Sequence, residues 1–159
     1  MIEIVLPSAL LKSASIAYIH YLSFMICFGA LIYERISLKV DPVRKEAIYM
    51  VLADIIYGIA GIALLVSGIY RVIKFGQGSE FYTQNPIFWI KIILFGLVGS
   101  LSLYPTITYV LWAIPLSKGT LPQVTEDLAS RLRLIINVEL VGFASIPFLA
   151  TLMARGVGL

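Results

Sequence analysis

A small set of ionisable side chains lies in or beside segments that are otherwise apolar, and these residues could carry chemistry. The set comprises one histidine, two acids and three cations: His20, Asp54, Glu139, Arg35, Arg71 and Lys91. An ionisable group inside a membrane is costly, so it marks a cofactor site, an ion pathway or a contact between helices. The histidine lies within the apolar run AYIHYLSFMICFGALIYER and is the only one in the chain.

His20 has two interpretations. A neutral imidazole is a good axial ligand for the iron of haem b or the magnesium of a chlorophyll, and Lys91 and Arg71 would then neutralise haem propionates. A bis-histidine haem within one chain is excluded, because there is no second histidine. In the alternative, His20 packs between helices and bonds to a hydroxyl or a backbone carbonyl.

The two acids lie at one depth. Asp54 and Glu139 each follow about six residues after the expected start of an apolar stretch, or roughly 9 Å of helix. They could pair with Arg35 and hold the helices in register, or they could form a proton relay. Lys91 and Arg71 lie near the opposite surface, where they could extend to lipid headgroups or bind an anion.

Composition predicts the elements that position these residues. Apolar residues make up 60% of the 159 residues and charged residues 13%, which is typical of an integral membrane protein. Four apolar stretches are long enough to cross a bilayer, at about 9–33, 48–70, 86–112 and 134–153. We therefore expect an all-α, four-transmembrane-helix bundle with a single domain over residues 1–159 and no nucleic-acid site.

The positive charges predict the orientation. The first and third connections hold most of the cations that flank the helices: Arg35, Lys39, Arg44, Lys45, Lys118, Arg131 and Arg133. The other side holds fewer: Lys12, Arg71, Lys74 and Arg155. Because cytoplasmic loops carry the excess of Lys and Arg, the N- and C-termini are expected on the non-cytoplasmic side.

Small residues follow one face of each of the first two helices. The first stripe comprises Ser13, Ala17, His20, Ser23, Cys27 and Ala30, and the second comprises Asp54, Gly58, Gly61 and Gly68. Two such faces allow close packing or leave space for a flat cofactor. Glycines in the second and third helices also permit a homodimer.

Two further signals concern the later helices. Pro105 predicts a kink near Leu101, because proline cannot donate a backbone hydrogen bond to that carbonyl. The stretch TEDLASRLR predicts an amphipathic start to the last helix, capped by Thr125 with acids in its first turn.

The motifs also resemble known families. HYLSFMICFGALIYER, DIIYGIAGIALLVSGIYR, FYTQNPIFWIKIILFGLVGSLSLYPT and IPFLATLMARG resemble an uncharacterised, domain-of-unknown-function family of small bacterial membrane proteins that is common in cyanobacteria. The first and third helices are more distantly similar to the HemJ-type protoporphyrinogen oxidases and the CopD-type copper-resistance membrane proteins. The HemJ resemblance implies a b-type haem, and the matching residues in this sequence are His20, Arg35 and Lys91. The chain departs from the HemJ pattern in the last helix, where ELVGFASIPF has no histidine.

Three functional hypotheses follow. The first is a membrane protein of the bacterial inner membrane or thylakoid that binds haem b through His20 and has a redox or tetrapyrrole-related role. If it is an enzyme, it is a haem-dependent membrane oxidoreductase. The second is an accessory or assembly subunit of a larger photosynthetic or respiratory membrane complex, with chlorophyll as the alternative cofactor. The third is a small proton-coupled transporter that uses Asp54 and Glu139. In all three, membrane lipids are partners.

Overall fold

Four long apolar helices build the computed structural model, which describes residues 7–158. They are α1 (Ser8–Ser37), α2 (Arg44–Tyr70), α4 (Pro86–Ser117) and α5 (Glu126–Ala154). A π-helical turn, η1 (Arg71–Phe75), extends α2, and a short helix, α3 (Ser79–Thr83), precedes α4. Each long helix is long and apolar enough to cross a membrane, and residues 7–158 contain no strand. The predicted all-α class with four membrane-spanning helices is confirmed.

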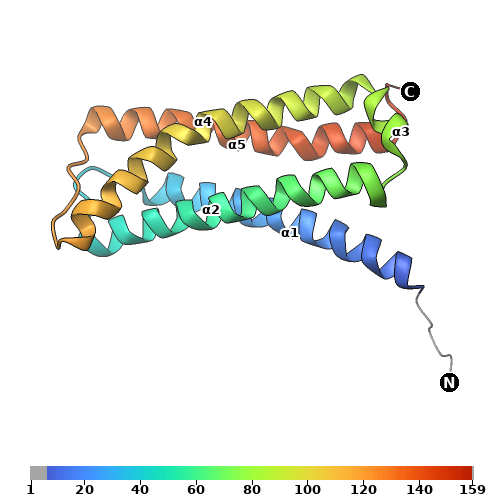
Figure 1. Ribbon diagram of the computed structural model, residues 1–159. Helices are drawn as coiled ribbons and strands as arrows, with labels where there is room; N and C mark the ends of the chain where they lie inside the picture. Colours follow the sequence, from blue (N-terminus) through green and yellow to red (C-terminus); the bar gives the residue numbers. More distant parts are fainter. Residues whose placement is uncertain (1–6, 159) are drawn as a thin grey trace.

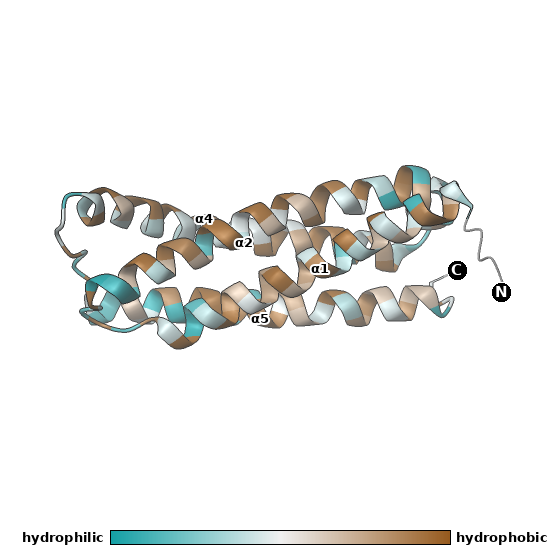
Figure 2. Ribbon diagram, turned by 90° about the horizontal axis from the view of Figure 1, so that it is seen from below, coloured by the Kyte–Doolittle hydropathy of each residue, from teal (hydrophilic) through white to brown (hydrophobic). Residues whose placement is uncertain are grey.

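The long helices lie side by side along their length (Figure 1). α1 packs mainly on α2 and α4 mainly on α5, and contacts of α2 with α4 and of α1 with α5 complete the bundle. The connections α1–α2 and α4–α5 lie at one end, which we call the two-loop end, and α3 lies at the other, the α3 end. Apolar residues predominate along the helices (Figure 2), and many large ones are exposed, as a lipid-facing surface requires.

The helices are longer than predicted at the two-loop end. α1 continues to Ser37, and this extra turn places Glu34 and Arg35 within the helix. α5 begins at Glu126, before the apolar stretch expected from residue 134 but at the amphipathic start predicted for TEDLASRLR. The predicted cap is confirmed, because Thr125 Oγ1 accepts a hydrogen bond from the Leu128 amide at 3.3 Å. The polar last turn of α1 was not predicted, because a hydropathy pattern follows the apolar interior of a helix rather than its termini.

The small-residue stripe predicted for α2 is partly wrong. Asp54 is buried and Gly68 approaches His20, but a Cβ built on Gly58 or Gly61 would meet no atom within 4 Å. The buried face of α2 instead follows Ala53, Asp54, Tyr57, Ala60, Leu64 and Ser67. Gly58 and Gly61 lie one residue beyond Tyr57 and Ala60 on the sequence, about 100° further around the helix. They therefore lie off the buried face of α2.

α4 changes direction near the middle of its length, as its ribbon shows in Figure 1. Pro105 lies within this helix and is buried. A proline removes the hydrogen bond to the carbonyl four residues earlier and crowds it, so the bend is the one predicted from the sequence. It carries the part of α4 that contains Tyr109 across the two-loop half of the bundle.

Candidate functional site

Each long helix contributes one ionisable side chain to a cluster in the half of the bundle nearer the two-loop end. Its members, which we call the carboxyl cluster, are Glu34 from α1, Asp54 from α2, Tyr109 from α4 and Glu139 from α5. Their exposed fractions are 1%, 5%, 0% and 0%. Asp54 and Glu139 each lie within electrostatic reach of Glu34, and Tyr109 lies within reach of all three acids. The structure thus brings together the two acids that the sequence placed at one depth.

The hydrogen bonds of the cluster are incomplete. Asp54 Oδ1 accepts a hydrogen bond from Thr106 Oγ1 at 2.7 Å. Four buried oxygens have no partner among the described residues: Oε1 of Glu34, the hydroxyl of Tyr109 and both carboxyl oxygens of Glu139. Buried polar atoms are nearly always paired, so unpaired ones mark a functional group or a bound molecule.

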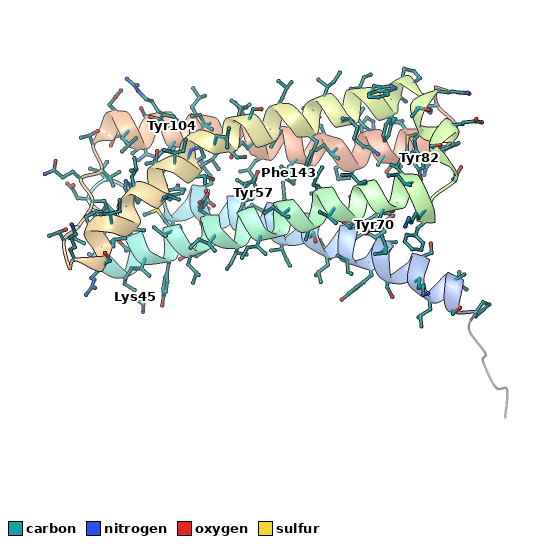
Figure 3. All side chains as sticks on the ribbon, in the orientation of Figure 1. Lys45, Tyr57, Tyr70, Tyr82, Tyr104 and Phe143 are labelled. Atoms are coloured by element: carbon teal, nitrogen blue, oxygen red, sulfur yellow. The ribbon has the colours of Figure 1, made fainter. Side chains whose placement is uncertain are left out.

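A hydroxyl pair lies beside the cluster in the same core. Tyr57 OH and Ser102 Oγ are 2.7 Å apart, and Ser102 donates to the Val98 carbonyl at 2.9 Å. The Tyr57 hydroxyl is therefore the donor to Ser102. Figure 3 shows Tyr57 facing Phe143 between α2 and α5, with ring centroids 6.1 Å apart, so an aromatic layer separates the cluster from the α3 half of the bundle.

No cation neutralises the cluster within residues 7–158. The three ion pairs found there lie at the exposed two-loop end: Lys39–Glu46, Arg131–Asp127 and Arg133–Glu126. Arg35, which the sequence suggested as a partner for the acids, instead donates from Nε to Asn137 Oδ1 at 2.7 Å. The described residues also contain no group of His, Cys, Asp or Glu arranged to hold a metal ion.

Sequence reasoning missed Glu34 and Tyr109. Glu34 lies four residues after Ala30 and so continues the α1 stripe. Its burial could have been predicted if the expected helix had been extended past residue 33. Tyr109 carried no comparable signal, because a tyrosine four residues after a helix proline fits equally well in a lipid-facing aromatic belt.

His20 lies in a separate polar contact between α1 and α2. Its Nδ1 is 3.1 Å from the Leu64 carbonyl and 3.0 Å from Ser67 Oγ. Ser67 donates its own proton to the Ala63 and Leu64 carbonyls, so Nδ1 carries the proton that both acceptors share. Gly68 lets the ring approach closely, because a Cβ at this position would lie 3.1 Å from His20 Cε1.

Arg71 and Lys91 lie in the same half of the bundle as His20, towards the α3 end. Both positive charges are within electrostatic reach of the His20 ring and of one another. Arg71 donates from Nη2 to the Tyr21 hydroxyl at 3.2 Å, and its guanidinium carbon is 4.9 Å from the centroid of the Tyr21 ring. The structure therefore groups His20 with two of the three predicted cations and leaves Arg35 at the other end.

The His20 site fits the chemistry of a single axial ligand. Its Nδ1 proton is held by a backbone carbonyl, which leaves the Nε2 lone pair for a metal. Two cavities, of about 330 Å³ and about 300 Å³, lie elsewhere on the surface. The first is lined by Ile26, Ala30, Tyr33, Tyr49, Leu52, Ala53 and Ile56, and the second by Ile69, Tyr70, Ile73 and Lys74.

Comparison with known proteins adds one match. The model of a family described as "Predicted membrane protein (DUF2214)" matches residues 12–158. No curated protein and no solved structure matches the chain significantly. The distant resemblance to HemJ-type and CopD-type proteins stays a prediction.

Proposed function

The chain belongs to the DUF2214 family of predicted membrane proteins, and on that premise we propose that it takes up and releases protons within the membrane, as a small proton-coupled transporter would. The observation that carries this proposal is the carboxyl cluster. Three acids from three helices share one buried core, and the described residues supply no cation to balance them.

The physical argument concerns charge. Transferring one isolated carboxylate from water into a low-dielectric interior costs several kcal/mol even after relaxation, and neighbouring like charges add to that cost. Three buried carboxylates cannot all be ionised at once, so the cluster retains protons. A group that keeps its proton when occluded and loses it when water or a cation reaches it is a proton-coupling element.

The packing supports an occluded site. Towards the two-loop end, the cluster is covered by buried apolar residues from helices and loops: Leu38, Leu116, Val124 and Leu132. Towards the α3 end, it is covered by Tyr57, Phe143 and Val98. Proton exchange therefore requires one of these two layers to open, which is the behaviour that alternating access demands.

Infrared spectroscopy of the purified protein tests the proposal. Protonated carboxyl groups in an apolar environment have a C=O stretch that ionised groups lack, and each buried acid is expected to contribute to it. Glu34→Gln and Glu139→Gln are each expected to remove part of this band and its change between acid and alkaline pH.

The matched control is Glu80→Gln, which changes an exposed acid of α3. It is expected to leave the band unchanged, and circular dichroism checks whether all three variants keep their helix content. A wild-type protein without the band, or equal bands in all variants, would overturn the proposal.

A second candidate function is favoured by one observation at His20. Because Nδ1 is bonded to Leu64 and Ser67, Nε2 is the nitrogen that could hold haem b, and Arg71 and Lys91 could neutralise its propionates. Haem would supply one-electron transfer, and the protein would supply one axial ligand and two counter-charges.

The absorption spectrum of the purified protein, oxidised and then reduced after addition of haem, tests this candidate. The expected result is a Soret band that shifts on reduction and is lost in His20→Ala. Ser15→Ala, which removes an exposed hydroxyl of the same helix, should keep the band. If wild type stays colourless, the second candidate fails and the carboxyl proposal is unaffected.

A further inference from the structure

Two cations at the α3 end lack an acidic partner among residues 7–158. Arg71 lies at the first position of η1 and Lys91 in the second turn of α4, and both are partly buried. The ion pairs of the described residues all lie at the other end of the bundle. The two positive charges nevertheless lie within electrostatic reach of one another, which is unfavourable unless a negative charge lies between them.

Aromatic rings hold both cations but do not neutralise them. Arg71 is fixed by the Tyr21 hydroxyl and ring. The Lys91 ammonium is 5.6 Å from the centroid of the Phe88 ring. A cation over a ring gains roughly 0.5–2 kcal/mol, but the formal charge remains. Both side chains are thus positioned in advance, with unused donor capacity: a guanidinium has five N–H groups and an ammonium has three.

We propose that Arg71 and Lys91 form a binding site for an oxyanion, a phosphate or carboxylate group, at the α3 end of the bundle. A guanidinium and an ammonium from different helices can contact separate oxygens of one such group. The phosphate of a phospholipid headgroup and a free anion from solution share this chemistry. The site goes beyond the proposed proton function and does not depend on the carboxyl cluster or on haem.

The anion would also complete the fold at this end. Arg71 belongs to η1, which extends α2, and Lys91 belongs to α4, which packs on α2, so the two like charges lie within electrostatic reach of one another. A bound oxyanion replaces that repulsion with two attractive contacts. Binding is therefore expected to stabilise the bundle, since a ligand that binds the folded state alone raises its stability.

Thermal unfolding in maltoside micelles, which contain no phosphate, tests the free-anion source. Inorganic phosphate is titrated at constant ionic strength, set with sodium chloride, so that screening is the same throughout. If the site takes a free oxyanion, phosphate raises the melting temperature with saturation. Arg71→Gln or Lys91→Gln is expected to weaken this effect about tenfold or more, as loss of one charge-assisted contact implies.

Native mass spectrometry tests the lipid source. The protein is reconstituted with phosphatidylglycerol and then released into maltoside, and retained lipid is counted. If the site takes a headgroup, wild type retains phosphatidylglycerol, Arg71→Gln and Lys91→Gln lose it, and inorganic phosphate has little effect.

Lys74→Gln is the matched control, because Lys74 is an exposed cation of η1 whose ammonium lies 5.8 Å from the Tyr70 ring centroid. It should behave as wild type in both experiments, and so should His20→Ala, which separates the anion site from haem binding. The inference is overturned if neither phosphate nor phosphatidylglycerol binds, or if Lys74→Gln loses as much binding as Arg71→Gln and Lys91→Gln.

Discussion

Asp54 and Glu139 are both buried acids, yet the structure treats them differently. Asp54 has a hydroxyl donor on α4, whereas both carboxyl oxygens of Glu139 lack a partner among the described residues. Removal of a donor from a buried acid leaves the acid unsatisfied, which costs more than the bond itself contributes. Asp54 is therefore the member of the carboxyl cluster whose structural role can be measured separately.

Thr106→Val removes the donor to Asp54 and keeps the shape of the side chain. We expect the free energy of unfolding in detergent to fall by about 1–3 kcal/mol, the cost of leaving a buried acceptor unsatisfied. Thr108→Val is the control, because Thr108 donates to the Tyr104 carbonyl of its own helix and should change stability much less. Equal losses in the two variants would show that the contact between Thr106 and Asp54 does not stabilise the bundle.

The sequence predicted individual residues less well than it predicted their depth. It placed Asp54 and Glu139 at one level, and the structure places both near Glu34. It suggested Arg35 as their partner, but Arg35 bonds to Asn137. The reason is rotational: depth follows from counting residues, whereas a partner depends on which face of each helix meets its neighbour.

At the scale of secondary-structure elements, the four long helices were predictable from the sequence, whereas the end of α1 was not. Every predicted membrane span corresponds to a helix, because about 20 apolar residues leave few alternatives. The polar turn that extends α1 has the composition of a loop, and packing rather than hydropathy makes it helical, whereas the capping pattern at Thr125 predicted the polar start of α5. Glu34 was missed for this reason, since it lies in a turn that the sequence assigned to a loop.

The glycines of α2 show a second limit at this scale. Glycine spacing suggested a face, because small residues are enriched at contacts between membrane helices, but glycine is common in membrane helices generally and its spacing alone does not identify the contact face. Gly68 is at a contact, whereas Gly58 and Gly61 are not. The larger buried residues Tyr57 and Leu64 mark the contact face of α2. Ala60 and Ser67 are buried on the same face.

At the scale of the whole molecule, charge differs between the two ends of the bundle. Lys and Arg are more frequent at the two-loop end, but acids accompany them there and form ion pairs. Orientation depends on the positive residues of short loops and little on the acids. The expected orientation therefore remains the one with the two-loop end in the cytoplasm and the termini outside.

Labelling of introduced cysteines in intact cells tests this orientation. Lys118→Cys and Gln77→Cys place exposed thiols in the α4–α5 connection and before α3, at opposite ends. A membrane-impermeant maleimide is expected to label Gln77→Cys in intact cells, and Lys118→Cys only after the membrane is permeabilised. The wild-type protein is the control, because its single cysteine, Cys27, is fully buried and should stay unlabelled. The reverse pattern would place the carboxyl cluster nearer the outer surface, and protons would then reach it from outside through the layer of Leu38 and Val124.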